Sequence, residues 1–214
     1  MAIKQIVITS GTTFIVPFDW NSANNRIEAI GGGGGGNANG GGGGGAYSRI
    51  NNFTAVVGQT IALSIGAGGA VNTDGGSTTF GNSNQIVAVG GSRASSSTVR
   101  APGGTAAASN GTIKFNGGNG GPSRGGGGGA GGPSGVGASA SATLSVQANA
   151  DGGRGGNNAG GLGGVATSVQ SPSAGQIGGN GTDLTSNGIL YSTGARPVSA
   201  GSGGGGAGSY YTDV

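Results

Sequence analysis

Short runs of β-branched and aromatic residues mark the first half of the chain. Residues 3–9 and 26–30 are two such runs, and large apolar side chains alternate with their neighbours across residues 14–18. A period of two is typical of a strand with one buried face. Pro17 cannot donate a backbone hydrogen bond and indicates a strand edge or end. The pattern therefore predicts three short strands here.

Two further runs, residues 47–57 and 60–65, are separated only by Gly58 and Gln59. A two-residue spacer between such runs is a β-hairpin signal, so the sequence predicts that they pair with each other. Residues 85–89 indicate one more strand. Later in the chain, residues 112–115 and 143–147 are the best strand candidates.

Glycine breaks every window long enough for an amphipathic helix, so we expect essentially no α-helix. Of 214 residues, 58 are glycine, against about 7% in average proteins. Twelve of them fill residues 31–36 and 40–45, separated only by residues 37–39. A solvated loop is one interpretation of this tract. The other is an ordered interior helix of polyproline II type, or a pair of such helices turned by residues 37–39. We favour this interpretation because lateral backbone hydrogen bonds in a stack can offset the entropy that glycine loses on ordering.

The second half of the chain has a three-residue period. X-Gly-Gly units occur in tandem from Asn116, from Asp151 and from Ala159. Polyproline II geometry has three residues per turn and no internal hydrogen bonds, so its backbone groups can pair with neighbouring segments. Two glycines per turn leave two faces without a Cβ, which allows close packing between neighbours. This register predicts a bundle of polyglycine II helices.

The expected fold is thus mainly β with irregular glycine-rich polyproline II-type (polyglycine II) helices. A β-sandwich-like base with the first glycine tract would span residues 1–91. A polyglycine II bundle with variable loops would span residues 92–214. Phe14, Phe18, Trp20, Phe53 and Phe80 lie with the strands, so we expect them in the base core.

Composition excludes several kinds of chemistry. The chain has no Cys and no His, so disulfides and thiolate or imidazole sites for metal or catalysis are absent. Its six carboxylates form no close pair in sequence, and residues such as Asp74 followed by glycine fit turns. We expect no enzyme, no cofactor and no metal.

Nucleic-acid binding and membrane insertion are not expected either. The net charge is only +3, and no GxxxxGK[ST] motif is present. Arg124 and Arg154 lie in RGG-like settings but lack interleaved aromatic residues. The first residues lack the apolar run of a signal peptide, so we expect none, and no apolar run reaches the length of a membrane helix.

Five elements in order carry a family resemblance. They are contained in FIVPFDWNSANNRIEAIGGGGGG, AYSRINNFTAVVGQTIALSIGAGGA and GGSTTFGN, and they fall at residues 14–17, 27–36, 57–65, 66–69 and 75–81. Residues 12–91 thereby resemble the glycine-rich domain of bacteriophage tail-fibre and receptor-binding proteins. The remainder is similar only in style to phage adhesin tips, in which polyglycine II bundles alternate with hypervariable loops.

The resemblance implies an adhesin at a virion tail-fibre tip or another extracellular fibre tip. Its partners would be a bacterial surface polysaccharide or outer-membrane protein and the rest of a tail fibre, with a homotrimer as the possible assembly. We expect receptor contacts in residues 92–102, 122–124, 183–196 and 209–211. The candidate contact residues are Arg93, Arg100, Arg124, Tyr191, Arg196, Tyr210 and Tyr211.

The sequence leaves three alternatives open. Tyr210 and Tyr211 would equally serve as a C-terminal anchor packed on the bundle. The whole chain could be a structural fibre-tip domain without its own receptor. It also resembles ice-binding polyglycine II proteins, although their register is more regular.

Overall fold

The computed structural model describes residues 4–37, 40–122, 126–140 and 210–213. These residues form strands and contain no helix. The strands are β1 (Gln5–Ile8), β2 (Thr13–Ile15), β3 (Arg26–Ile30), β4 (Tyr47–Asn51), β5 (Thr60–Ser64), β6 (Thr78–Phe80), β7 (Ile86–Ala88), β8 (Ile113–Phe115) and β9 (Tyr210–Asp213).

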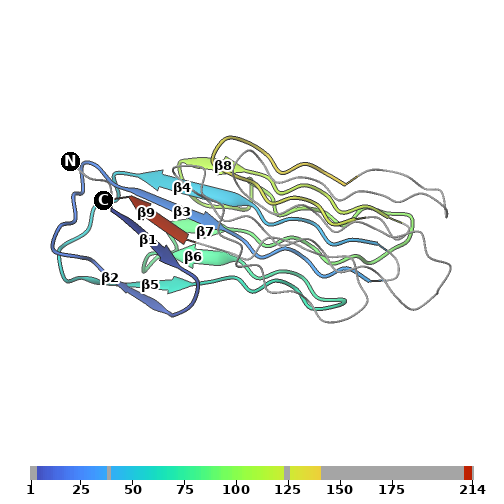
Figure 1. The fold of residues 1–214 in the computed structure, drawn as a ribbon, viewed down its shortest axis with the longest axis horizontal. Helices are drawn as coiled ribbons and strands as arrows, with labels where there is room; N and C mark the ends of the chain where they lie inside the picture. The colour runs from blue at the N-terminus through green and yellow to red at the C-terminus, as the bar shows by residue number, and fades with distance from the viewer. Residues whose placement is uncertain (1–3, 38–39, 123–125, 141–209, 214) are drawn as a thin grey trace.

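Two antiparallel sheets form the base of the molecule (Figure 1). The five-stranded sheet has the order β1-β9-β3-β4-β8, and the four-stranded sheet has the order β2-β5-β6-β7. Strand β9 lies between β1 and β3 and pairs antiparallel with both. β8 and β9, which follow residue 91 in sequence, thus belong to the same sheet as β3 and β4. The division of the chain at residue 91 stays a prediction.

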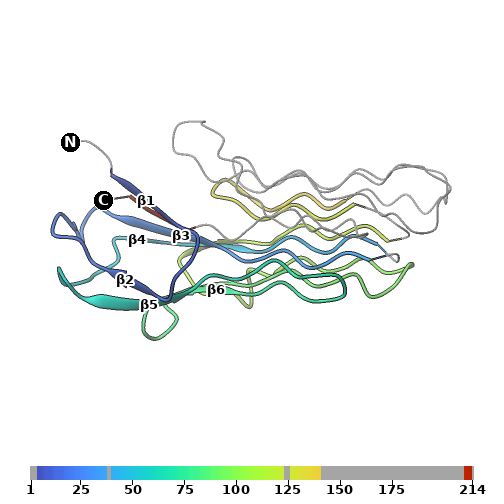
Figure 2. The same ribbon diagram turned by 60° about the horizontal axis from the view of Figure 1, so that its bottom comes forward.

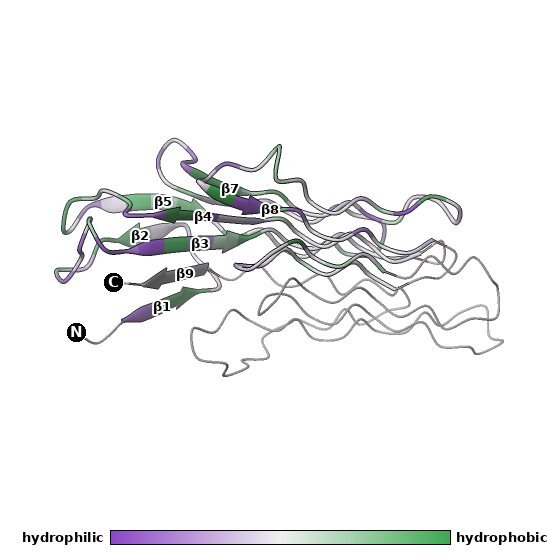
Figure 3. Cartoon of the chain, turned by 90° about the horizontal axis from the view of Figure 1, so that it is seen from above, coloured by the Kyte–Doolittle hydropathy of each residue, from purple (hydrophilic) through white to green (hydrophobic). Residues whose placement is uncertain are grey.

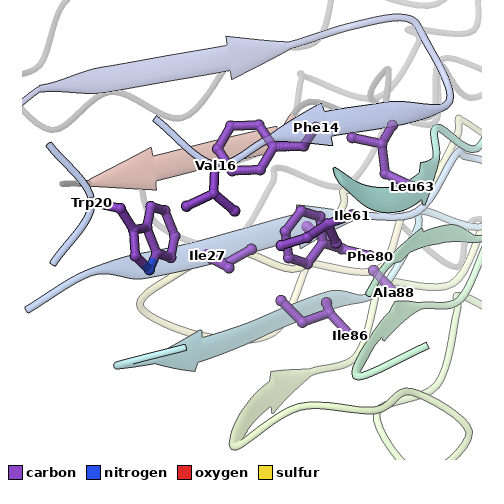
Figure 4. Packing of buried hydrophobic residues seen from close by; sticks show 10 residues of the cluster. Phe14, Val16, Trp20, Ile27, Ile61, Leu63, Phe80, Ile86 and Ala88 are labelled. Atoms are coloured by element: carbon purple, nitrogen blue, oxygen red, sulfur yellow. The ribbon is translucent and has the colours of Figure 1, made fainter. Parts of the chain in front are cut away.

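The main hydrophobic core takes side chains from both sheets (Figure 4). Ile27 of β3, Ile61 of β5 and Ile86 of β7 are almost fully buried there, as is Phe80 of β6. The two-residue alternation of β5 gives this burial directly, because Ile61 and Leu63 are buried while their neighbours are exposed. The prediction of a sandwich-like base is confirmed to this extent: two antiparallel sheets enclose a common core.

One aromatic residue departs from the expected core. Phe14, Trp20 and Phe80 are buried and Phe53 packs against them, but Phe18 is 87% exposed. Strand β2 ends at Ile15, and the Trp20 backbone N–H donates to the Pro17 carbonyl at 3.1 Å in the turn that follows. The alternation that predicted burial of Phe18 therefore stops before reaching it.

The predicted hairpin of residues 47–57 with residues 60–65 is wrong. β4 pairs with β3 and β8 in the five-stranded sheet, whereas β5 pairs with β2 and β6 in the other sheet. Residues 52–59 cross between the sheets and include a tight turn, in which the Gln59 N–H donates to the Val56 carbonyl at 2.9 Å. Asn52 starts this crossing with a φ of 56°, and its N–H donates to the Asn25 carbonyl at 2.8 Å. Local spacing predicted the turn but not the partner of each strand.

Glycine-rich segments continue from the base as long, nearly parallel traces (Figures 1 and 2). Residues 31–36 leave β3, and residues 40–45 return to β4. They run antiparallel, with Gly31 N–H donating to Ala46 and Gly34 N–H donating to Gly43. Both segments are buried. The tract is therefore ordered over residues 31–37 and 40–45, and Asn37 and Gly40 form a bridge between the two segments.

Lateral backbone hydrogen bonds recur every third residue along these segments. Gly41 and Gly44 donate to Gly121 and Gly118, at 3.0 and 2.9 Å. On another side of the same segment, Gly42 and Gly45 accept from the backbone of residues 128 and 131. Successive residues thus bond to different neighbouring segments, which satisfies backbone groups that burial would otherwise leave without partners.

We call residues 40–45 the central glycine segment. Close approach of neighbouring backbone explains why this segment needs glycine at every position. A Cβ added at Gly42, Gly43 or Gly44 would meet a backbone carbonyl closer than 3.0 Å. The three carbonyls belong to three different segments, around residues 34, 102 and 129. No rotamer change can relieve such an overlap, because the neighbouring atoms are main chain. The segment is enclosed on all sides.

Peripheral segments need fewer glycines. Gly117 and Gly118 face other segments as closely, whereas Asn116 and Asn119 are exposed. The two asparagine side chains accept hydrogen bonds from the N–H groups of Ala106 and Gly103. The X position of an X-Gly-Gly unit therefore lies on the outside and links neighbouring segments.

Hydropathy divides the molecule into the same two parts (Figure 3). The strands of the base carry the strongest hydrophobic and hydrophilic residues, while the glycine segments are mostly near neutral. Burial of hydrophobic side chains away from water stabilises the base. The glycine segments instead rest on backbone hydrogen bonds and close backbone contact. No helix within the described ranges is long and apolar enough to cross a membrane.

Candidate functional site

Two loops lie where glycine segments turn, at the end of the molecule opposite the strands (Figure 1). We call residues 70–74 and 93–101 the far-end loops. Each is attached to the first glycine segment by backbone hydrogen bonds, from Gly35 N–H to Thr73 O and from Ala94 N–H to Gly35 O, both 2.9 Å. The scaffold thus fixes both loops next to the same residue.

Asn37 links the two far-end loops through its side chain. Its Nδ2 atom donates to the Asn72 side chain in one loop and to the Ala94 carbonyl in the other, the latter at 2.7 Å. Asn72 has a φ of 64°, a left-handed conformation that asparagine tolerates better than most residues. A single amide group therefore holds the relative position of the loops.

An ion pair also joins the loops. Asp74 Oδ1 accepts from the Arg93 backbone N–H at 2.8 Å, and Asp74 Oδ2 lies 3.5 Å from Arg93 Nη1. Both side chains are at least half exposed. Solvent screening makes such a pair a weak source of stability, so its exposed charges are available to an incoming partner.

Arg100 is positioned differently. Its Nη1 atom donates to the Ala140 carbonyl at 2.7 Å and is partly buried. One part of this guanidinium therefore ties the far-end loops to the segment at residues 137–140. Val71 and Val99 provide apolar surface in the two loops and are 37% and 62% exposed.

The predicted contact residues fall into separate places. Arg93 and Arg100 lie in the far-end loops. Tyr210 and Tyr211 lie in β9 at the base, where their backbones pair with β1 and β3. Arg124, Tyr191 and Arg196 are outside the described residues, as are residues 123–124 and 183–196. The structure does not bring the tyrosines of β9 together with Arg93, and receptor contact by these residues stays a prediction.

Asn37, Asn72 and Asp74 were not among the predicted site residues. The sequence pattern marks Asp74 as a turn residue because glycine follows it, and it marks Asn37 as part of the turn between glycine segments. Both readings describe the local chain. A role in linking two loops depends on long-range register, which the sequence pattern does not contain.

A second polar cluster is buried in the base, on the five-stranded sheet. The Tyr47 hydroxyl donates to Glu28 Oε1, and Arg26 Nε lies 3.4 Å from Glu28 Oε2. Burial raises the pKa of Tyr47 far above its usual value, and the charge and hydrogen bond of Glu28 act in the same direction. The Arg49 guanidinium beside this hydroxyl acts in the opposite direction. Tyr47 and Glu28 are buried, whereas the two arginines are partly exposed, so the cluster favours one strand register and offers no enclosed site.

Among the described residues, no group of three or more His, Cys, Asp or Glu side chains gathers at one place. The far-end loops offer hydroxyls, amides, one ion pair and valines. Such a surface can recognise a partner by hydrogen bonds and shape.

The molecule is a glycine-rich β protein. It has an antiparallel β base, a buried network of hydrogen-bonded glycine segments and linked loops at the opposite end. A family described as "Glycine-rich domain" matches residues 8–213. The chain therefore belongs to the Glycine-rich domain family. No curated protein matches it.

Proposed function

We propose that the protein is an adhesin that binds a bacterial surface receptor through its far-end loops, as at the tip of a phage-type tail fibre. The observation that carries this proposal is the attachment of both loops to Gly35 by backbone hydrogen bonds. Loops held in this way have little freedom left to lose when a partner binds. The protein would act by binding and not by catalysis.

The scaffold is proposed to be a bundle of polyglycine II helices. Support comes from the three-residue recurrence of lateral hydrogen bonds along residues 41–46. It also comes from three consecutive glycines, 42–44, that approach three different segments. Three residues per turn is the repeat of the polyproline II conformation.

The placement of the base suggests how the protein would be mounted. β1 and β9 lie at the end opposite the far-end loops (Figure 1). A fibre attached through the base would leave the loops pointing away from the virion. The receptor would be a surface polysaccharide or an outer-membrane protein, and three copies are the expected assembly.

Binding of labelled protein to a panel of bacterial strains tests the proposal. We expect binding to some strains and not others, with loss of binding for Arg93→Ala and Val99→Ser. The matched base-surface variant Val57→Ser, whose side chain is 52% exposed, should bind as the parent protein does. Circular dichroism of each variant checks that the fold is unchanged.

Three outcomes would contradict the proposal. Equal binding to every strain, or to none, would favour a structural fibre element without a receptor. Undiminished binding by both far-end variants would move the receptor surface elsewhere. Thermal hysteresis in a freezing assay would instead indicate an ice-binding protein.

A further inference from the structure

Asn-Gly pairs are the sequence positions at which a protein chain most readily loses ammonia from a side-chain amide. The following backbone nitrogen attacks the asparagine carboxamide, and glycine offers no Cβ to obstruct it. The described residues contain three complete pairs, beginning at Asn110, Asn116 and Asn119. Their backbone nitrogens have different surroundings.

Two of these nitrogens take part in the hydrogen bonds between glycine segments, which we call the glycine network. Gly117 N–H donates to Gly104 O at 2.9 Å, and Gly120 N–H donates to Ala101 O at 2.8 Å. Both glycines are buried. Attack on the preceding side chain would require each nitrogen to leave its carbonyl partner and rotate within a closely packed segment.

Gly111 is different. Its N–H donates to Oδ1 of Asn110 at 3.1 Å, that is, to the carboxamide it would attack. The other end of that carboxamide is fixed, because Asn110 Nδ2 donates to Asn84 O at 2.9 Å. Asn110 is exposed, and Gly111 has a φ of 143°. Gly111 is half-buried, and its nitrogen already lies beside the carboxamide of an exposed asparagine.

We propose that Asn110 is a site of spontaneous deamidation in the folded protein, and that the glycine network protects Asn116 and Asn119. Base removes the Gly111 amide proton, and the nitrogen forms a bond to Cγ of Asn110. The bond from Cγ to Nδ2 breaks, and ammonia leaves with a proton from the medium. One water molecule then opens the succinimide at either carbonyl, which gives aspartate or isoaspartate without any change of oxidation state.

The modification alters a junction between strands. Asn110 exchanges two backbone hydrogen bonds with Val87 in β7, at 2.9 and 3.0 Å. Its carbonyl also accepts from Ser48 Oγ in β4. Isoaspartate adds a methylene to the main chain and converts this carbonyl into a free carboxylate. Both products also add one negative charge.

Mass spectrometry after incubation in mildly alkaline buffer tests the proposal. Trypsin separates the sites, because Arg100, Lys114 and Arg124 place Asn110 in the peptide 101–114 and both other asparagines in 115–124. We expect the folded protein to gain about 1 Da per site in the first peptide several-fold faster than in the second. Synthetic peptides of the same two sequences should show no such preference.

Asn110→Gln is the control variant, since its longer side chain would have to close a six-membered ring and should stay unmodified. Equal rates at the three sites in the folded protein would overturn the proposal. So would deamidation of folded Asn110 more slowly than in its free peptide, because that result would mean that the turn opposes the attack.

Discussion

The Tyr47 hydroxyl donates a hydrogen bond to the Glu28 carboxylate across strands β4 and β3, and both side chains are buried. Glu28 lies directly opposite Arg49 in the strand register, and Tyr47 lies two residues before Arg49 on the same strand. A buried carboxylate is costly unless it is bonded and paired. The Tyr47 hydroxyl and the arginines provide those partners and so favour one register of the two strands.

Replacing Tyr47 with Phe should destabilise the fold. The change removes a donor and leaves a buried carboxylate with one partner fewer, which typically costs about 1–3 kcal/mol. Urea unfolding measures the difference. Glu28→Gln keeps an acceptor, so Tyr47→Phe should cost less in that background; an unchanged midpoint for Tyr47→Phe alone would contradict this role.

Alkaline pH should weaken the fold through the same tyrosine. The folded protein raises the pKa of Tyr47 above its ordinary value near 10, so the unfolded chain loses this proton first as pH rises. The stabilisation is fully present below about pH 10 and falls above it by about 1.4 kcal/mol per pH unit. Unfolding measured from pH 8 to 11.5 should therefore show a shallower alkaline loss for Tyr47→Phe than for the parent protein.

Enclosure of the central glycine segment predicts a contrast between two glycine-to-alanine variants. In Gly43→Ala the new methyl overlaps the Pro102 carbonyl, and overpacking of this kind costs about 1–3 kcal/mol or more. Gly135→Ala meets nothing within 4 Å and should be neutral or slightly stabilising, because alanine restricts the unfolded chain. Thermal unfolding of both variants tests this, and equal midpoints would argue against close packing at Gly43.

The asparagines of the X-Gly-Gly units should also contribute to stability. Asn119→Ala removes the acceptor for the buried Gly103 N–H, so we expect a loss of about 1–2 kcal/mol. Asn24→Ala, at an exposed position in the base, is the matched control. If both variants unfold at the same denaturant concentration, the side-chain bridge contributes nothing.

Amide hydrogen exchange should distinguish the glycine segments from the loops. Gly41, Gly43 and Gly44 are buried, and their N–H groups donate to carbonyls of neighbouring segments, so they should exchange slowly. The N–H of Ser95, an exposed residue in a far-end loop, should exchange quickly. Rates for the three glycines as fast as in a free peptide would contradict the network.

Local pattern predicted much of the base. The alternation at residues 60–65 and the β-branched run at residues 26–30 became β5 and β3, since each signal is contained in a few neighbouring residues. β6 was missed because its three residues are too few to show a period. β9 was missed because Tyr210 and Tyr211 suggested a recognition surface, and four residues gave no evidence of a distant strand pair.

Partnership between segments was harder to predict than the segments themselves. The order of X-Gly-Gly units indicated that glycine would pack against glycine, but nothing in residues 41–45 specifies which carbonyl each N–H will meet. The hydrogen bonds from Asn37 to both far-end loops could not be predicted from the sequence for the same reason. Segments without side chains contain no sequence signal that specifies which segments they will pack against.

The position of β9 has a consequence for how the protein is made. Among the described strands, β1 pairs only with β9, although the two lie at opposite ends of the sequence. During synthesis, residues 5–8 cannot form their hydrogen bonds with β9 until residues 210–213 have left the ribosome. Such distant closure slows folding and prolongs the exposure of open strand edges. A nascent chain that stalls before residues 210–213 are made would therefore leave β1 without its partner strand, and quality-control proteases would meet an unpaired strand.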